Sequence, residues 1–191
     1  MNFVTTKVFD KNIAAYRSGK RRALNCGGTT SGKTYSIIAL LILIAWYAKR
    51  PLLISVTSES LPHLKRGCIR DFQNIMGDSY DPERYNATDH IYDFGNGKLE
   101  FFPSGDADAQ RGGRRDILYI NECNNVSYDA YRNLDVRTNL FTFLDWNPVA
   151  EFWVNENGLD IAPENGYIHS TYLDIIDYIN IMQDWHNPHS D

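Results

Sequence analysis

The chain has 191 residues, of which 43% are hydrophobic and 23% charged, and these ordinary globular proportions exclude wholesale disorder. This length suits one domain, or one domain with an appendage, and can bury a sizeable core without disulfides or metals. The formal net charge of -5 excludes a surface coated for nucleic acid, so any DNA contact must come from local patches or a partner domain.

The N-terminal residues show no signal-peptide pattern, and no apolar run reaches the ~20 residues of a membrane span. We therefore expect a protein with no membrane association. Cys26, Cys68 and Cys123 lack the spacing of a metal site, which favours reduced, structural thiols in a cytosolic compartment.

The first predicted element is a short helix over residues 10–17. Phe9, Asn12 and Tyr16 lie on or beside it, just ahead of the first predicted strand. They form either a wall for a nucleotide base or a packing surface against the sheet, and the burial tendency of aromatic residues favours packing.

A phosphate-binding pattern, G-x-x-x-x-G-K-[ST], follows over residues 27–34, which read GGTTSGKT. A short buried strand is predicted before it at 23–26, and an apolar helix after it at 35–47. Loop amides and the helix N-terminus then converge on phosphate oxygens, while Lys33 adds charge at the β- and γ-phosphates and Thr34 can bind Mg²⁺. The residues expected to contact the nucleotide are Gly28, Thr29, Thr30, Ser31, Gly32, Lys33, Thr34 and Tyr35.

The next stretch predicts a strand at 52–56 and a helix from about 61 to 76. Lys65, Arg66 and Arg70 lie along that helix, either as a solvated face or as a patch that faces phosphate or DNA. A β-hairpin is then predicted over residues 91–102.

A loop with several arginines precedes the next strand. Arg111 and Arg114 are candidates for a cation that reaches the γ-phosphate within the chain or in a neighbouring subunit. The alternative is that they only close the surface near the nucleotide site.

A second acidic motif follows the near-continuous apolar strand at 117–120. In phosphate-loop ATPases an Asp at this strand tip holds the Mg²⁺ shell, and the following Glu polarises the attacking water. Glu122 fits the second role, whereas Asn121 stands at the metal side and brings an amide oxygen but no charge.

The remaining elements are a helix at 127–134 and strands at 140–144 and 167–172. Asp145 and Asn147 follow the strand at 140–144, which is expected to insert between the phosphate-loop strand and the acidic-motif strand. There they either sense the γ-phosphate or simply form a turn before Pro148. The predicted fold is an α/β P-loop NTPase with a mostly parallel central sheet flanked by helices.

Several blocks in this order resemble the large subunit of tailed-bacteriophage terminase. They are CGGTTSGKTYS (26–36), LPHLKRG (61–67), IRDF (69–72), RG (111–112), ILYINE (117–122), RT (137–138), DWNP (145–148), EFWV (151–154) and HSTY (169–172). The resemblance spans about residues 9–172, and the ordered set is more specific than any one block.

The resemblance implies an Mg²⁺-dependent ATPase that packages double-stranded viral DNA into the procapsid. It also implies that the P-loop fold is of the additional-strand, catalytic-Glu type. It implies that Lys33, Thr34 and Asn121 serve phosphate and metal, that Glu122 is the catalytic acid, and that Asp145 and Asn147 lie in the coupling motif. The implied partners are double-stranded DNA, the portal protein and the small terminase subunit. A ring on the portal and a location in the host cytoplasm, transiently at the procapsid portal, are also implied.

Two departures from the family pattern stand out. Many members carry an Arg inside the phosphate loop, where this chain has Thr29 and Thr30, and Asn121 replaces the usual Asp. We expect a terminase-like ATPase domain at 1–175, a tail or linker start at 176–191, and no nuclease site within this sequence. The alternatives are a nucleotide-gated binding module with little turnover, or another P-loop ATPase such as a helicase-like protein.

Overall fold

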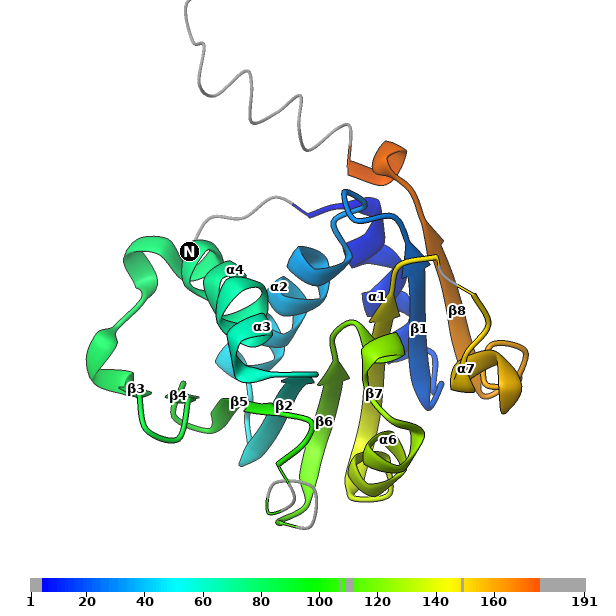
Figure 1. Cartoon of the computed structure of the whole chain (residues 1–191). Coiled ribbons are helices and arrows are strands. Elements are labelled where there is room, and N and C mark those ends of the chain that lie inside the picture. Colours follow the sequence, from blue (N-terminus) through cyan, green and yellow to red (C-terminus); the bar gives the residue numbers. More distant parts are fainter. Residues whose placement is uncertain (1–4, 107, 109–111, 149, 176–191) are drawn as a thin grey trace, which may run out of the picture.

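A computed structural model describes residues 5–106, 108, 112–148 and 150–175 (Figure 1). Its described strands form one sheet with the order β3-β4-β5-β2-β6-β7-β1-β8. The strands are β1 (Arg22–Gly27), β2 (Leu52–Ser58), β3 (Tyr85–Asn86), β4 (Ile91–Asp93), β5 (Gly97–Pro103), β6 (Arg115–Ile120), β7 (Thr138–Trp146) and β8 (Asn165–Ser170).

The sheet is mostly parallel. The neighbours β5, β2, β6, β7, β1 and β8 all run in the same direction, and β3 and β4 extend one edge in antiparallel pairing. Strand β7 lies between β6 and β1, which confirms the predicted inserted strand. As a result the carboxyl ends of β1, β6 and β7 meet at one edge of the sheet, the upper edge in Figure 1.

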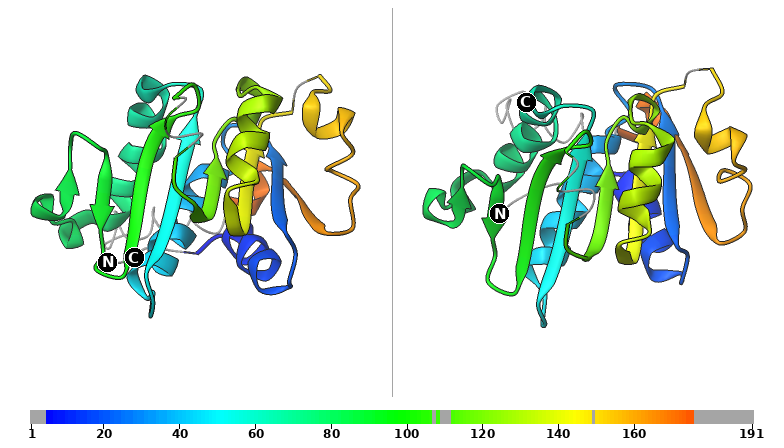
Figure 2. Two further views of the ribbon diagram at one scale, coloured as in Figure 1. Left: turned by 90° about the horizontal axis from the view of Figure 1, so that it is seen from below. Right: turned by 60° about the horizontal axis from the view of Figure 1, so that its bottom comes forward.

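Helices cover both faces of the sheet, as Figure 2 shows. The described helices are α1 (Lys7–Arg17), α2 (Lys33–Trp46), α3 (Leu61–Arg66), α4 (Cys68–Met76), α6 (Tyr128–Asp135) and α7 (Trp153–Glu156). Short 3₁₀ turns are η1 (Gly77–Ser79), η2 (Pro82–Arg84), η3 (Cys123–Asn125) and η4 (Tyr172–Ile175).

Alternating strand residues divide the core into two layers. Ile117 and Tyr119 of β6 point into the larger layer, formed with α1, α2 and α4, whereas Leu118 and Ile120 point into the layer with α6 and α7. Helix α2 carries apolar residues on nearly all sides because it is buried in the larger layer. Packing on both faces of the sheet therefore holds in place the strand ends from which the loops of the site emerge.

The helix predicted over residues 61–76 is broken. Gly67, with φ -107° and ψ -100°, separates α3 from α4, so the single-helix prediction is wrong. The predicted hairpin is confirmed as β4 and β5. The predicted tail at 176–191 lies outside the described residues.

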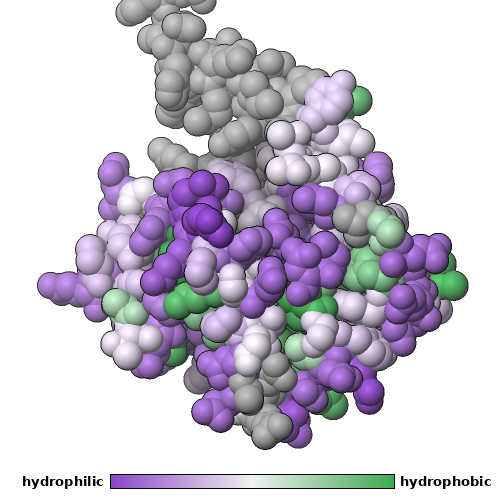
Figure 3. All heavy atoms as spheres, in the orientation of Figure 1, coloured by the Kyte–Doolittle hydropathy of each residue, from purple (hydrophilic) through white to green (hydrophobic). Residues whose placement is uncertain are grey.

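The face of the molecule seen in Figure 3 is mainly hydrophilic, and its hydrophobic atoms lie in separate small areas. All three cysteines are buried and free, as predicted. Over the described ranges, every helix is too short or too polar to cross a membrane.

Candidate active site

An open pocket of about 640 Å³ lies at the carboxyl edge of the sheet. The β1–α2 loop forms one wall, and Gly32, whose φ of 73° suits glycine, turns the chain into α2 at Lys33. Six of the eight predicted nucleotide contacts line this pocket: Thr29, Thr30, Gly32, Lys33, Thr34 and Tyr35. The N-terminus of α2 therefore lies at a cavity large enough for a nucleotide.

Lys33 is buried at the floor of the pocket. Its Nζ donates to the carbonyl oxygens of Gly27 at 2.6 Å and Gly28 at 3.0 Å, and to Asn147 Oδ1 at 3.2 Å. Burial lowers the pKa of Lys33, although the negative charge of Asp145 acts in the opposite direction. The ammonium is thus held beside the loop and already touches one of the two predicted coupling residues.

Asn121 connects the acidic motif to the phosphate loop. Its Nδ2 lies within hydrogen-bond distance of three oxygen atoms: Asp145 Oδ1 at 3.1 Å, Tyr119 Oη at 3.2 Å and Thr34 Oγ1 at 3.3 Å. Because Asp145 requires a donor, the Asn121 amide group is oriented with its nitrogen toward the carboxylate. The Oδ1 atom then faces Gly67, whose added Cβ would lie 3.9 Å from it, on the pocket side.

Asp145 is a buried carboxylate below this amide. It accepts from the backbone N–H of Glu122 at 2.9 Å as well as from Asn121. Burial raises the pKa of Asp145, and the nearby Lys33 charge opposes that change. The residue belongs to β7 itself, which runs to Trp146, so the predicted strand end at 144 is two residues short.

Glu122 adopts a left-handed backbone conformation with φ 51°, which is uncommon for a residue other than glycine. Its Oε2 lies 3.4 Å from His63 Nδ1 and 3.3 Å from Asn125 Nδ2. The side chain is half-exposed and lines the same pocket as Lys33. Backbone strain of this kind recurs at functional sites, and here it turns the carboxylate toward the cavity.

The segment α3–Gly67–α4 forms the opposite wall. Its pocket-lining members are His63, Arg66, Gly67, Arg70 and Asp71. Lys65 does not line the pocket. The two alternatives for this basic segment therefore apply to different residues: Arg66 and Arg70 line the pocket, and Lys65 does not.

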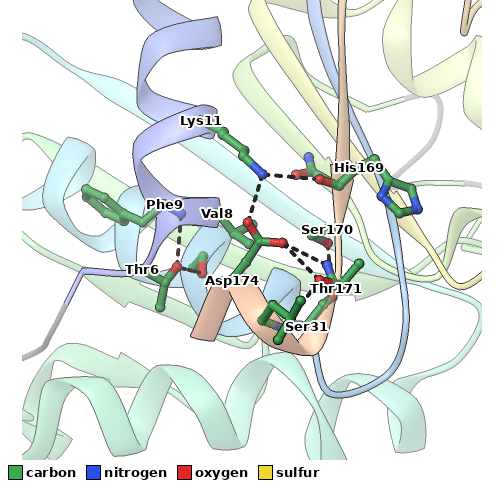
Figure 4. A network of polar contacts seen from close by, with 12 residues as sticks. Thr6, Val8, Phe9, Lys11, Ser31, His169, Ser170, Thr171 and Asp174 are labelled. Carbon is green, nitrogen blue, oxygen red and sulfur yellow. Dashed lines mark hydrogen bonds and ion pairs between the residues drawn. The ribbon is translucent and has the colours of Figure 1, made fainter. Parts of the chain in front are cut away.

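The end of β8 packs against the phosphate loop (Figure 4). Ser170 Oγ donates to Ser31 Oγ at 3.0 Å, and Asp174 accepts from Thr171 N at 2.8 Å and Lys11 Nζ at 2.9 Å. An added Cβ on Gly27 would lie 2.3 Å from both Ser170 O and Ser170 Oγ. The phosphate loop, β8 and the start of η4 thus form one hydrogen-bonded unit.

Of the two predicted arginines, the structure describes only Arg114, which does not line the pocket. Arg111 lies outside the described residues, and Arg114 is exposed just before β6. Six strand residues separate Arg114 from the site, about 20 Å of strand. This placement excludes Arg114 as a cation for the pocket of its own chain, and a role in a neighbouring subunit stays a prediction.

The possible base wall is a packing surface. Phe9 and Asn12 are buried, Asn12 Nδ2 donates to Asn25 Oδ1 at 2.8 Å, and Tyr16 packs edge-on against Phe141. These contacts tie α1 to the sheet and confirm the packing interpretation.

Sequence reasoning gave no individual role to four residues of the site, although all of them lie in the blocks that carry the resemblance: Tyr119, His63, Asp71 and Ser170. Tyr119 lies in an apolar strand run and gives no signal of its own. His63 has the clearest signal, since it follows a strand that ends at the site edge. It is one of five histidines spread along the sequence, and none of them forms a cluster there. Over the described residues, no group of three or more His, Cys, Asp or Glu could hold a metal.

The sheet order and the phosphate loop together define the fold of a P-loop NTPase. No protein-family model matches the sequence, and no curated protein sequence matches it. Solved structures do share the fold, and they are large terminases of bacteriophages.

The large terminase of a thermophilic bacteriophage aligns with a TM-score of 0.78 and 14% identity over 97% of this chain and 50% of its own. The ATPase domain of the Thermus phage P74-26 large terminase aligns with a TM-score of 0.60 and 14% identity, covering 98% and 89%. The HK97 bacteriophage large terminase aligns with a TM-score of 0.67 and 13% identity, covering 88% and 39%. This chain spans about half the length of the first of these proteins, which has also been solved with ADP and with ATP-gamma-S.

Proposed function

We propose that this chain is the ATPase motor domain of a phage terminase large subunit, which couples ATP hydrolysis to the packaging of double-stranded viral DNA. The observation that carries the proposal is that the phosphate-loop Lys33 and the strained Glu122 line the same pocket. The fold shared with phage large terminases, one of them solved with ADP and with ATP-gamma-S, supports it.

Nucleotide binding begins at the phosphate loop. The amides of residues 28–34 and the α2 N-terminus would surround the β- and γ-phosphates. Lys33 Nζ, now shared between two loop carbonyls, exchanges those oxygens for phosphate oxygens. In this proposal the exchange requires the Lys33 side chain to leave those two carbonyl oxygens.

The residues beside the loop fit a magnesium ion. Mg²⁺ prefers oxygen ligands and keeps several waters, so Thr34 Oγ1 would hold the ion directly. Asn121 turns its Nδ2 toward Thr34 at 3.3 Å, so its Oδ1, on the Gly67 side of the pocket, would act through a bound water. Buried Asp145 supplies the negative charge that Asn121 lacks. When bound, the ion neutralises charge on the β- and γ-phosphate oxygens.

Glu122 is the general base in this proposal. It accepts a proton from a water molecule as the water oxygen forms a bond to the γ-phosphorus. The bond between that phosphorus and the bridging oxygen breaks, and its electron pair leaves with ADP. The Glu122 N–H bond to Asp145 and the His63 contact with the carboxylate fix the position of the base before substrate arrives.

Coupling to movement would start at two contacts of the loop. Asn147 touches Lys33, and Ser170 touches Ser31, so a change at the γ-phosphate reaches both β7 and β8. The partners in this proposal are DNA, the portal protein and the small terminase subunit, with a ring assembled on the portal in the host cytoplasm. With a net charge of -5, DNA binding by the isolated chain should be weak and salt-sensitive.

The test is steady-state ATP hydrolysis with and without Mg²⁺, in the wild-type chain and in Glu122→Gln. Loss of a general base should lower kcat by about 10²- to 10⁴-fold. Glu156→Gln is the matched control, because Glu156 is exposed on α7 and does not line the pocket.

A second function has one observation in its favour. Asn121 leaves the metal side of the motif uncharged, which would suit a module that binds ATP as a signal without turnover. If the wild type and Glu122→Gln hydrolyse ATP at the same background rate, the result supports the binding module and refutes the proposed motor function.

A further inference from the structure

The broken helix α3–Gly67–α4 places cations in the nucleotide pocket. Helix α3 follows β2, the direct neighbour of β6 in the sheet, and so lies beside the acidic motif (Figure 1). The 3.4 Å contact between His63 Nδ1 and Glu122 Oε2 shows how closely α3 approaches the proposed base.

Arg66 lies on the same face of α3 as His63. Residues three apart on a helix are surface neighbours, and both of these line the pocket. The adjacent Lys65 points elsewhere and does not line it. Arg66 therefore lines the pocket on the same helix face as His63, the residue that contacts Glu122.

Arg66 also differs from Arg70 in its partners. The guanidinium of Arg70 lies 3.7 Å from Asp71 Oδ1, whereas Arg66 has no ion pair with any residue that the structure describes. Arg66 is exposed to the cavity and keeps its full charge for a ligand.

The phosphate loop itself lacks a second cation. Its only cationic side chain is Lys33, which is buried against loop carbonyls and Asn147, and Thr29 and Thr30 are neutral. A triphosphate in this pocket would bring more negative charge than one ammonium can balance. A planar guanidinium with several fixed donors suits the oxygens of a phosphoryl group.

We infer that Arg66 is the arginine that contacts the γ-phosphate from within the same chain, in place of an arginine in the phosphate loop. This inference rests on the proposed ATPase function. Arg66 donates hydrogen bonds to γ-phosphoryl oxygens as the new bond from water forms and the bond to the ADP oxygen breaks. It neither gives nor takes a proton, since Glu122 receives the proton of the water.

The first experiment measures the affinities of ADP and ATP-gamma-S by titration calorimetry in the wild type, Arg66→Ala and Lys65→Ala. A charge-assisted hydrogen bond to the γ-phosphate predicts that Arg66→Ala weakens ATP-gamma-S binding about 10-fold or more. ADP affinity should change less than about threefold, because ADP has no group at that position. Lys65→Ala removes a neighbouring charge outside the pocket and should leave both affinities unchanged.

The second experiment measures turnover. Arg66→Ala should lower kcat about 10³-fold, in the range of arginines that stabilise phosphoryl transfer. Arg66→Lys keeps the positive charge but loses the planar guanidinium with its fixed donors. Compared with Arg66→Ala, it should therefore restore ATP-gamma-S affinity more than kcat. Equal melting temperatures of Arg66→Ala, Arg66→Lys, Lys65→Ala and the wild type show that misfolding does not explain a loss of affinity or turnover.

A mixing experiment separates the same chain from a neighbour. If Arg66 served an adjacent subunit, mixing Arg66→Ala with Glu122→Gln would restore activity, because each could complete the other's site. The inference predicts no restoration, and restoration would overturn it. Equal losses of ADP and ATP-gamma-S affinity in Arg66→Ala, or behaviour matching Lys65→Ala, would overturn it as well.

Failure of the proposed function has a different signature. A wild-type chain that binds ATP-gamma-S without turnover refutes the motor, while the two affinities still decide the contact between Arg66 and the γ-phosphate. A chain that binds neither nucleotide refutes both.

Discussion

Replacement of Gly27 by alanine should disrupt the packing of the phosphate loop against β8 and destabilise the protein. The added Cβ would lie 2.3 Å from Ser170 O and 2.3 Å from Ser170 Oγ, about 1 Å inside an ordinary contact distance. The hydroxyl can rotate away, but Ser170 O belongs to β8, which pairs with β1 through the register Gly27↔Ser170. The strand itself must therefore move.

The expected loss of stability has two parts. Overpacking of this size costs about 1–3 kcal/mol. Loss of the 3.0 Å hydrogen bond between Ser170 and Ser31 adds about 0.5–1.5 kcal/mol. The sum, about 1.5–4.5 kcal/mol, corresponds to a fall in Tm of about 3–18 °C at roughly 2–4 °C per kcal/mol for a domain of this size.

The assay is thermal unfolding followed by circular dichroism, with Gly28→Ala as the matched control. Gly28 lies one residue away in the same loop, and no atom comes within 4 Å of its added Cβ. Its variant should unfold within about 2 °C of the wild type, because an unstrained surface change alters stability by less than about 0.5 kcal/mol. Equal Tm values for Gly27→Ala and the wild type would refute the close packing of β8 on the loop.

Three further outcomes are expected. Lys33→Ala should weaken ATP-gamma-S binding at least about 10-fold, measured by titration calorimetry, because it removes the loop's only cationic side chain; unchanged affinity would contradict that role. Asn147→Ala removes the acceptor 3.2 Å from Lys33 Nζ and should lower kcat more than ADP affinity, and a change in ADP affinity alone would contradict a coupling role. Partial burial raises the pKa of Asp174, but the N–H of Thr171 and the ammonium of Lys11 together hold it below its ordinary value of 3.8. The stability from this carboxylate is thus present above pH 3.8 and is lost as pH falls through the lower folded pKa. The Tm difference between the wild type and Asp174→Asn should shrink over that acid range, and a constant difference would contradict the pairing.

Local signals predicted the centre of the fold well. The glycines of the phosphate loop, the short apolar strand before it and the apolar run after it lie within one continuous stretch, so β1, the loop and α2 could be derived from neighbouring residues. The position of β7 between β6 and β1 followed from the fold class that the loop and the acidic motif defined together.

Other features depend on contacts between distant residues. Gly67 interrupts an apolar pattern that fits one helix, and a glycine inside such a pattern is tolerated often enough that it does not by itself fix a break. The place of Arg66 in the pocket depends on how α3 packs against β2 and β5, which charge spacing cannot show. Tyr119 reads as a core residue, and only the fold brings its hydroxyl to Asn121.

The two strand-tip residues illustrate the same limit. Asp145 and Asn147 were both predicted at the tip of an inserted strand. Asn147 does contact Lys33, whereas Asp145 is buried within β7 and holds Asn121 and the backbone of Glu122. Their positions in the sequence predicted that both residues lie at the site, and only the hydrogen bonds show that the two residues contact different groups.

The central claim is that the phosphate loop grips a triphosphate while Glu122 faces its terminal phosphorus. A crystal structure of the chain with Mg²⁺ and ATP-gamma-S measures this directly. The account predicts the triphosphate against residues 28–35, with Lys33 Nζ on phosphate oxygens and the Glu122 carboxylate on the γ-phosphate side. An empty pocket, or a bound nucleotide whose γ-phosphate lies on the side away from Glu122, would contradict it.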